Sequence, residues 1–464
     1  MSASVEYADV GAAVLADLTA GLPAGALVVD RGVVDGYRRD RADTVEPGWP
    51  LALVRATSTT DVQHVLRTAS AHRVPVVPRG AGTGLSGGAS ATDGCLLLSL
   101  EALRDIEIDA PAMVAVAGAG VLNGELKRVA AQHGLWYPPD PSSYEICSIG
   151  GNLSTNAGGL CCVKYGVTTD YVLGCDVVLA DGTLLRLGGR TIKDVAGYDL
   201  KRLFVGSEGT LGVITSATLR LRPLPAPAVT LVATFASVEA AGRAVSSIVA
   251  AHRPATLELM DAATVRAVEA FRPRGLDVGA GATLLAQSDA GPAAAAEIAA
   301  TEAVCVDEGA TFVAVTDDAD EGEMFMQARR EAFPALMRLG TTLIEDVGVP
   351  IPRIAELVAG VERVAARHDT SIAVVGHAGD GNVHPLISFD PADAAAVERA
   401  DAAFAAVVEL ALSLGGTLTG EHGVGVVKAP FLAAQLGPEV LDVSRRIKDA
   451  LDPLGILNPG KLLT

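Results

Sequence analysis

Short apolar runs separated by polar and glycine-rich stretches make up much of the first half of the chain. Four such runs predict buried strands at 51–54, 74–77, 95–98 and 114–117. Between the first two, apolar residues recur at helical spacing from Thr60 to His72, behind a Thr-Asp pair that predicts the N-cap. A strand, a helix and a strand in this order are typical of an α/β unit.

Further along, residues 171–223 alternate short β-rich runs around an Asp181-Gly182 pair, which predicts strands joined by a turn. The proline-dense stretch 222–228 follows, and we place a domain boundary after residue 223. Beyond it, helical periodicity is expected near 238–252, 292–309, 320–339, 353–369, 391–414 and 431–451. Strands are expected at 229–235, 255–260, 282–287, 311–315, 372–377 and 383–389. Sheets covered by helices make this an α+β protein.

Composition narrows the class of function. The chain has 36 basic and 55 acidic residues, a net charge of −19, which argues against nucleic-acid binding. Its longest apolar candidate, 404–414, falls short of the roughly 18 residues that a membrane span needs. The N-terminus carries acid where a targeting peptide carries base, so we expect a cytoplasmic protein. Six cysteines without a CxxC pair indicate neither a disulfide framework nor an iron–sulfur cluster.

A glycine-rich stretch, PRGAGTGLSGG at 78–88, follows the second predicted strand directly. Successive backbone N–H groups of such a turn form a concave anion site. The formal GxGxxG match is followed by a poor helix start, so we do not expect a Rossmann turn, and a Walker A motif is absent. Two more glycine clusters, 148–159 and 205–214, are present, and the first is too glycine-rich and polar for a packed element. Three clusters predict a long ligand threaded between them, with a structural turn as the alternative.

Histidines and an acid form a second constellation in the second half. If Asp380-Gly381 is a two-residue type I′ turn, His377 and His384 lie directly opposite each other on a hairpin, which suits two imidazoles on one metal ion. Glycines flank Glu421-His422, so that backbone can approach a site closely. A His2Glu set with an open position is typical of catalytic rather than structural metals. The alternative is that these are ordinary core or surface histidines, as we expect for the other five.

The glycine clusters resemble those of FAD-linked oxidases of the vanillyl-alcohol oxidase and para-cresol methylhydroxylase type. PRGAGTGLSGG is similar to the pyrophosphate loop of that family, DPSSYEICSIGGNLSTNAGG to the stretch around the flavin and diphosphate, and VGSEGTLGVIT to the stretch that closes on the flavin. The resemblance implies a two-part FAD-binding domain at 1–223, with a small parallel and a larger mixed sheet and a core of about 46–223. It implies a cap domain at 224–464, with an antiparallel sheet covered by helices and a C-terminal segment 431–464 that packs back on the FAD domain.

The same resemblance implies which residues contact FAD. They are Pro78, Arg79, Gly80, Ala81, Gly82, Thr83, Gly84, Leu85, Ser86, Pro139, Asp140, Ser142, Ser143, Ser148, Ile149, Gly150, Gly151, Asn152, Asn156, Ala157, Gly158, Gly159, Glu208, Gly209, Gly212, Val213 and Ile214. Cys161 stands where some relatives carry a flavin-linked histidine, so we expect noncovalent FAD, with a cysteinyl link as the alternative.

GHAGDGNVHP, GEHGVGVVK and LDPLGILNPGKLL resemble the D-2-hydroxyacid dehydrogenase branch, which includes D-lactate dehydrogenases and the glycolate oxidase flavin subunit. The resemblance implies that His377, His384 and Glu421 bind a divalent metal, Zn²⁺ first and Mn²⁺ as the alternative. It implies that His422 is the catalytic base and that Arg329 clamps the substrate carboxylate, with Arg330 as the adjacent alternative. The expected substrate-binding residues are Arg329, His377, His384 and His422.

The expected function is therefore FAD- and metal-dependent oxidation of a D-2-hydroxy acid to the 2-oxo acid, by hydride transfer to flavin N5. Leu386 stands where hydroxyglutarate-oxidising relatives tend to carry an amide, so a small or apolar substrate side chain, as in D-lactate or glycolate, is favoured. Electrons would pass to a quinone, a cytochrome, an electron-transfer flavoprotein or an iron–sulfur subunit, not to a nicotinamide, with oxygen as the alternative acceptor. The alternatives are a flavin subunit of a glycolate oxidase complex and a metallohydrolase that uses the same histidines. A homodimer is left open.

Overall fold

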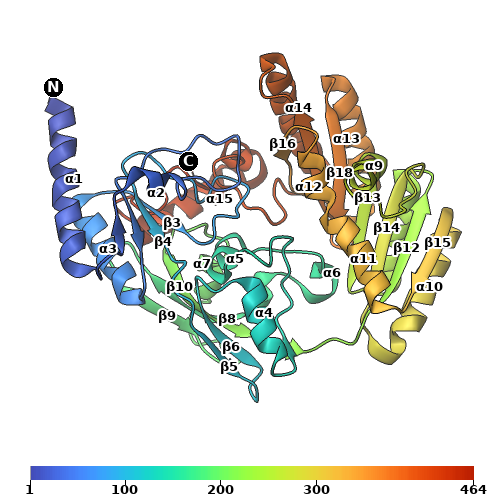
Figure 1. Cartoon of the computed structure of the whole chain (residues 1–464), viewed down its shortest axis with the longest axis horizontal. Coiled ribbons are helices and arrows are strands. Elements are labelled where there is room, and N and C mark those ends of the chain that lie inside the picture. The colour runs from blue at the N-terminus through green and yellow to red at the C-terminus, as the bar shows by residue number, and fades with distance from the viewer. Residues whose placement is uncertain (1, 464) are drawn as a thin grey trace.

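The structure, a computed structural model, describes residues 2–463 (Figure 1). Three of the first four predicted strands lie in a four-stranded sheet, and the fourth, 114–117, lies in a second sheet. The order of the four-stranded sheet is β1-β2-β4-β3, in which β2, β4 and β3 are parallel. The strands are β1 (Leu27–Val28), β2 (Ala52–Arg55), β3 (Val76–Arg79) and β4 (Leu96–Ser99). The helix α3 (Thr59–His72) joins β2 to β3. Its N-cap is Ser58, which forms a capping box with Asp61, so the cap lies two residues before the predicted Thr60.

The second sheet has five strands in the order β5-β6-β10-β8-β9. They are β5 (Ile106–Asp109), β6 (Val114–Gly118), β8 (Val172–Val178), β9 (Leu184–Gly188) and β10 (Val213–Arg220). Every pairing in it is antiparallel, where we expected a mixed sheet, because tight turns join β5 to β6 and β8 to β9. A short pair, β7 (Leu135–Trp136) and β11 (Arg222–Pro223), closes this half.

The helices of the first half are α1 (Ser2–Gly21), α2 (Arg31–Asp35), α4 (Asn123–Ala131), α5 (Ile149–Thr155), α6 (Cys162–Tyr165) and α7 (Lys201–Phe204), with a 3₁₀ turn at Thr168–Tyr171. The helix α5 contradicts our expectation that cluster 148–159 forms no packed element. Ser148 caps it by accepting the N–H of Gly151, and Asn156 ends it in the left-handed conformation. A Cβ on Gly150 would lie 2.7 Å from that of Ala119, so glycine allows the helix to pack closely against the sheet.

The second half is built on an antiparallel sheet in the order β15-β12-β14-β13-β18-β19-β16, with β17 paired to β19. Its strands are β12 (Val229–Phe235), β13 (Thr256–Asp261), β14 (Ala282–Ser288), β15 (Ala310–Thr316), β16 (Thr341–Ile344), β17 (Val347–Gly348), β18 (Ser371–His377) and β19 (Asn382–Phe389). We predicted neither β16 nor β17, because the polar and glycine residues around them hide the short apolar runs.

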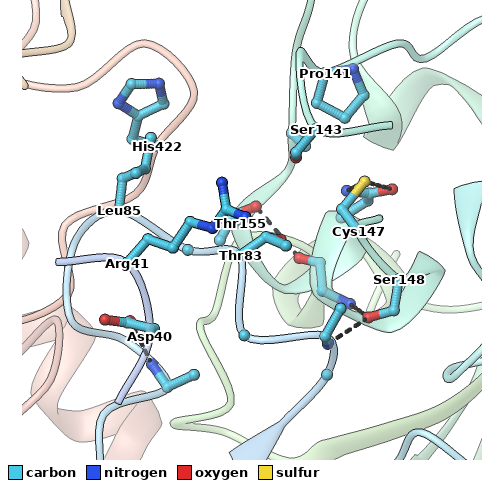
Figure 2. A pocket seen from close by; sticks show the side chains of 18 of the residues that line it. Asp40, Arg41, Thr83, Leu85, Pro141, Ser143, Cys147, Ser148, Thr155 and His422 are labelled. Atoms are coloured by element: carbon cyan, nitrogen blue, oxygen red, sulfur yellow. Dashed lines mark hydrogen bonds between the residues drawn. The ribbon is translucent and has the colours of Figure 1, made fainter. Parts of the chain in front are cut away.

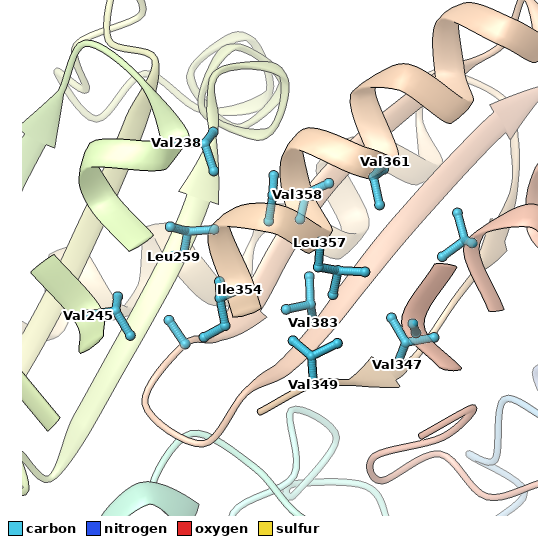
Figure 3. Packing of buried hydrophobic residues seen from close by; sticks show 14 of the residues in the cluster. Val238, Val245, Leu259, Val347, Val349, Ile354, Leu357, Val358, Val361 and Val383 are labelled. Atoms are coloured by element: carbon cyan, nitrogen blue, oxygen red, sulfur yellow. The ribbon is translucent and has the colours of Figure 1, made fainter. Parts of the chain in front are cut away.

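Helices cover both faces of this sheet. One face carries α8 (Val238–Ala251), α10 (Ala294–Asp307), α13 (Ile354–His368) and α14 (Ala394–Ser413). Figure 3 shows Ile354, Leu357 and Val358 of α13 packed toward Leu259 and Val383 of the sheet. The other face carries α9 (Ala262–Phe271), α11 (Ala319–Arg330) and α12 (Ala332–Met337).

Two predicted helices are interrupted. The single helix expected at 320–339 is split into α11 and α12, because Pro334 cannot donate to the carbonyl of Arg330 and its ring would clash there. The helix α15 (Leu432–Leu451) contains a kink at Gly437, whose φ of +74° is followed by Pro438. We did not predict α9.

The C-terminal residues lie against the first half of the molecule (Figure 1). The N–H of Val76 in β3 donates to the carbonyl of Ile456 at 2.8 Å, and the N–H of Asn458 donates to the carbonyl of Val76 at 2.8 Å. Asn458 also donates from Nδ2 to the carbonyl oxygen of Glu208. Residues 456–458 therefore extend the small sheet beside the glycine-rich loop. None of the described helices is long and apolar enough to cross a lipid bilayer.

Candidate active site

A cavity of about 620 Å³ lies between the two halves and is lined by both. Figure 2 shows Arg41, Thr83, Leu85 and Ser143 of the first half facing it together with His422 of the second. The expected FAD contacts that line it are Pro78, Arg79, Gly80, Ala81, Gly82, Thr83, Gly84, Leu85, Ser86, Ser142, Ser143, Ser148, Gly150, Gly151, Asn152, Ala157, Gly158, Glu208, Gly209, Gly212, Val213 and Ile214. The three glycine clusters thus meet at one cavity.

Five expected FAD contacts, Pro139, Asp140, Ile149, Asn156 and Gly159, stand behind the cavity wall. Ile149 is fully buried in the core, and Asn156 accepts the N–H of Thr169 at 2.9 Å. The carbonyl of Pro139 accepts from Asn123, and Asp140 accepts from the backbone and thiol of Cys161. A Cβ on Gly159 would lie 2.3 Å from the carbonyl oxygen of Asp140. These residues shape the wall rather than face the cavity.

The loop after β3 offers its N–H groups to the cavity side. Within the described part of the chain, none of the N–H groups of residues 82–88 donates to a protein acceptor. Its carbonyls are engaged, because Gly84 accepts from Arg41 and Ser86 accepts from Val426 and Val427. No helix follows the loop before β4, as we expected. A run of free N–H groups is the arrangement that binds phosphate oxygens.

Glycine is needed in this loop for steric reasons. Gly82 has a φ of +72°, and a Cβ there would lie 2.0 Å from Nη2 of the buried Arg79. A Cβ on Gly80 would lie 2.3 Å from Oγ of Ser148. At Gly80 and Gly82 the loop is therefore packed against Ser148 and the Arg79 guanidinium without room for a Cβ.

Arg41 is a cavity residue that the sequence analysis did not find. Its backbone N–H donates to Gly84 at 2.8 Å, which places the residue beside the glycine-rich loop. Among the described residues, no acceptor contacts its guanidinium. Figure 2 shows the side chain extended toward Thr83 and Thr155. Nothing in the arginine-rich stretch 38–41 distinguishes this arginine from its neighbours, because the distinction comes from the tertiary fold.

The histidine hairpin has a different register from the one we predicted. His377 pairs with Asn382, and His384 pairs with Val375, so four residues rather than two form the turn. A type I′ turn needs positive φ at both central residues, and only Gly381 has it. The two histidines are consequently diagonal neighbours on one face, and their ring centroids still lie 5.2 Å apart.

His377, His384 and Glu421 form a compact set of potential metal ligands, with one ligand atom from each within 4.8 Å of the others. Nε2 of His377 and Nε2 of His384 each lie 3.4 Å from Oε1 of Glu421. The His422 ring stacks on that of His384 at 4.9 Å, and its Nε2 lies 3.8 Å from the same Glu421 oxygen. His384, Glu421 and His422 line the cavity, whereas His377 lies just behind them.

Buried carboxylates surround these histidines. Glu258, which is 1% exposed, lies 2.9 Å from Nδ1 of His377 and 2.8 Å from Nε of Arg329. Burial opposes protonation of His377, but Glu258 and Glu421 outweigh it and raise the pKa of His377 well above its usual range. Burial lowers the pKa of His384 to about 3. Although burial opposes ionisation of Glu421, the neighbouring histidines lower its pKa to about 2.

Arg329 and Arg330, the two candidate substrate arginines, both line the cavity but differ in their surroundings. Arg329 is 4% exposed, and its buried Nη2 has no hydrogen-bond partner among the described residues. Arg330 lies nearer the surface and pairs with Glu323 at 2.5 Å. Arg329 is therefore the arginine with a free donor in a buried setting.

Two carboxylates that organise this half of the site, Asp346 and Glu258, were missed by the sequence analysis. Oδ2 of Asp346 accepts the N–H groups of Gly420, Glu421 and His422, each at 2.9 Å. Neither acid belongs to a recognisable motif, since Asp346 lies 76 residues from His422 and Glu258 lies 119 residues from His377. Only the antiparallel sheet brings them together.

Two family patterns and several known proteins match the chain. The pattern of the family described as "FAD binding domain" matches residues 50–188, and that of "FAD linked oxidases, C-terminal domain" matches residues 224–462. The chain is 46% identical to "Glycolate oxidase subunit GlcD" of Bacillus subtilis, covering 89% of each chain. It is 37% identical to "D-lactate dehydrogenase" of Archaeoglobus fulgidus, covering 92% of this chain and 96% of that one.

A solved structure of p-cresol methylhydroxylase with substrate bound matches with a TM-score of 0.83 over 98% of this chain and 97% of that one. At 18% identity this match shows the fold alone. It confirms the expected fold class.

Proposed function

The chain belongs to the FAD-linked oxidases and is an oxidoreductase of the glycolate oxidase and D-lactate dehydrogenase type, and on that premise we propose that it oxidises a D-2-hydroxy acid to the 2-oxo acid with bound FAD and a divalent metal ion. One observation carries the proposal. The metal-ligand set of His377, His384 and Glu421, the neighbouring His422 and the buried Arg329 adjoin the same cavity as the phosphate-type loop. The metallohydrolase alternative is set aside, because an FAD-binding pattern covers residues 50–188.

The residues present fit FAD. The free N–H groups of 82–88 and the unpartnered guanidinium of Arg41 suit a pyrophosphate. The Cys161 thiol donates to Asp140 and is not among the described residues that line the cavity, which supports noncovalent FAD. When bound, FAD supplies the acceptor for two electrons.

The residues present also fit a divalent metal. Nε2 of His377 is buried and makes no hydrogen bond within the described chain, while its Nδ1 is held by Glu258. A carboxylate on the second nitrogen is the usual way in which a ligating imidazole is oriented. The negative surroundings that favour a proton on His377 equally favour a cation in its place. Two nitrogens and a carboxylate oxygen suit Zn²⁺, with Mn²⁺ as the alternative, and such an ion lowers the pKa of a coordinated hydroxyl.

His422 is the proposed general base. Its imidazole faces the cavity, stacks on the ring of His384 and stands 3.8 Å from the carboxylate that would hold the metal. A neutral imidazole in this position can take the proton of the substrate hydroxyl. Arg329 is the proposed carboxylate clamp, because its free Nη2 can complete a bidentate contact with the substrate.

The sheet face next to His384 indicates the substrate side chain. Val375 lies opposite His384, while Leu386 is two residues further along β19 and lies opposite Ile344. The apolar side chains of Val375, Leu386 and Ile344 line the cavity, and α12 adds Phe333 and Met337. These surfaces favour an apolar substituent over a second carboxylate, so we propose D-lactate or a longer aliphatic D-2-hydroxy acid as substrate.

The electron acceptor is the final part of the proposal. The Bacillus subtilis relative is named as a subunit of a glycolate oxidase, which supports a further protein component for this chain as well. A partner carrying an iron–sulfur cluster, a cytochrome, an electron-transfer flavoprotein or a quinone would receive the electrons. The net charge of −19 suits a partner with a basic docking surface. We place the reaction in the cytoplasm.

The test is anaerobic reduction of the bound flavin by D-lactate in a stopped-flow instrument, comparing His422→Ala with His368→Ala. His368 ends α13 on the opposite side of the sheet and serves as the matched control. We expect His422→Ala to slow flavin reduction by about 10²–10⁴-fold, the usual contribution of general-base catalysis, and His368→Ala to leave it unchanged. Full reduction rates in His422→Ala would refute the base assignment.

A further inference from the structure

We propose that Asp346 is the positioning residue for the turn that carries Glu421 and His422, and this inference rests on the proposed function. Its side chain is fully buried, and one oxygen accepts four hydrogen bonds. Oδ2 accepts the backbone N–H groups of Gly420, Glu421 and His422 at 2.9 Å and the hydroxyl of Thr419 at 2.7 Å. Three successive amides of the functional turn thus converge on a single carboxylate oxygen.

Other contacts of the turn come from the first half of the chain, where Ser86 donates to the carbonyl of His422 at 3.1 Å and Glu208 accepts the N–H groups of Val424 and Gly425. The turn belongs to no helix or strand, and Gly420 and Gly423 flank the two functional residues without side chains that could pack. Asn382 donates to Oδ1 of Asp346 at 2.7 Å, and a Cβ on Gly420 would lie 2.1 Å from the same amide nitrogen. Lys428 donates to the carbonyl of Asp346 at 2.7 Å. Asp346 is itself held firmly, and the turn is held through it.

Asp346 acts on the site through the backbone and not as a ligand. Asp346, His384 and His422 are close enough together to hold a metal ion. However, Oδ2 of Asp346 already accepts four donors, and Oδ1 accepts Asn382 and lies on the side of His384 that faces away from Glu421. Oδ1 lies 3.6 Å from Nδ1 of His384, the nitrogen turned away from Glu421.

The consequence is a specific loss when the carboxylate is removed. Three backbone N–H groups would lose their common acceptor, and the Glu421 carboxylate and the His422 ring would no longer be fixed relative to the hairpin histidines. Partners of metal ligands typically contribute about 10–100-fold to metal affinity or activity. We therefore expect Asp346→Ala to weaken metal binding by about that factor and to lower kcat more than it raises KM.

The experiment titrates Zn²⁺ and, separately, Mn²⁺ into chelator-treated, FAD-loaded full-length protein, with a competing fluorescent chelator as the readout. The matched control is Asp61→Ala. Asp61 is also a buried carboxylate, and its Oδ2 accepts the N–H and hydroxyl of Thr57 at 2.8 Å and the N–H of Ser58 at 3.1 Å, far from the metal ligands. Both variants lose a multiply bonded buried acceptor, so a general loss of stability affects both.

We expect Asp346→Ala to bind Zn²⁺ about 10–100-fold more weakly, Asp346→Asn to lie between it and the wild type because one oxygen acceptor remains, and Asp61→Ala to bind as the wild type does. Asp346→Ala binding within twofold of the wild type, or Asp61→Ala losing as much, would overturn the proposal. If Asp346→Ala does not fold, Asp346→Asn takes its place, and binding of Zn²⁺ within twofold of the wild type would again overturn the proposal.

Failure of the proposed function has a different signature, because the wild type itself would then bind neither metal. Hydrogen exchange of the amides of 420–422 tests the positioning role in that case. Faster exchange in Asp346→Asn than in the wild type, with Asp61→Ala unchanged, supports it, and unchanged exchange overturns it.

Discussion

The carboxylate of Glu208 accepts the backbone N–H of Gly425 at 2.7 Å and thereby joins the glycine cluster of the first half to the turn that carries His422. Its other oxygen accepts the N–H of Val424 at 2.7 Å. Glu208 is 7% exposed and has a φ of +52° in the SEGT turn that lines the cavity. The two halves of the proposed active site are thus tied by one acidic side chain.

This contact predicts a pH dependence of stability. Burial raises the pKa of Glu208 to about 7 from its ordinary value of 4.5, so the folded protein binds a proton there that the unfolded chain releases. Glu208 therefore adds on the order of 3 kcal/mol to the free energy of unfolding below about pH 4.5. This contribution is lost as the pH rises through about 7. In Glu208→Gln, the fall in thermal midpoint between pH 5 and pH 8 should be shallower. An equal fall in thermal midpoint between pH 5 and pH 8 in the wild type and the variant would contradict this prediction.

A second prediction concerns the phosphate-type loop. Gly82→Ala should weaken FAD binding at least tenfold, because the new Cβ would collide with the Arg79 guanidinium. Gly94→Ala is the matched control, since Gly94 has a φ of +71°, nearly that of Gly82 at +72°, but no atom within 4 Å of its Cβ position. Both variants carry about 1–2 kcal/mol of backbone strain. Only Gly82→Ala should lose flavin in a reconstitution titration followed by flavin fluorescence, and equal losses would show that strain alone is responsible.

Arg41→Ala should lower FAD affinity by about tenfold or more, because it removes an unpaired cation beside the free N–H groups of the loop. Arg39→Ala is the control, as that guanidinium is paired with Glu46 at 3.1 Å and does not line the cavity within the described chain. The difference between the two variants should shrink at high salt. Equal affinities for FAD would exclude a phosphate contact of Arg41.

Leu386→Asn should change substrate preference. Leu386 is 1% exposed and shares the cavity face with His384 and Val375, so a polar side chain there removes apolar contact with the substrate substituent. We expect kcat/KM for D-2-hydroxyisocaproate to fall by roughly 10-fold relative to that for D-lactate, which corresponds to about 1.4 kcal/mol of lost apolar contact. Because both substrates are measured with the same variant, a general loss of activity does not change the ratio of the two kcat/KM values. An unchanged ratio would place the substrate side chain elsewhere.

Local patterns predicted most strands and helices because the spacing of apolar residues within one element is a local property of the sequence. They predicted that His377 and His384 meet, although the register was wrong, since direct and diagonal neighbours of a hairpin both share a face. Cluster 148–159 was misjudged because glycine, a poor helix former, is used in α5 for close contact with the sheet.

The supporting residues could not be predicted in this way. Glu258 contacts His377 across 119 residues of sequence, and Asp346 contacts His422 across 76. Arg41 lines the cavity, unlike the neighbouring arginines, because its backbone N–H is hydrogen-bonded to the carbonyl of Gly84. Each of these roles depends on a contact between segments that are far apart in the sequence. The pattern of residues within either segment does not predict that contact.

The central claim, a metal- and flavin-dependent oxidation of D-2-hydroxy acids, is tested most directly by anaerobic flavin reduction in the purified protein before and after chelator treatment, with D- and L-lactate. We predict that D-lactate bleaches the flavin, that L-lactate does not, and that chelation abolishes the D-lactate reaction until Zn²⁺ or Mn²⁺ is returned. Flavin reduction by D-lactate that persists undiminished in metal-free protein would contradict the account.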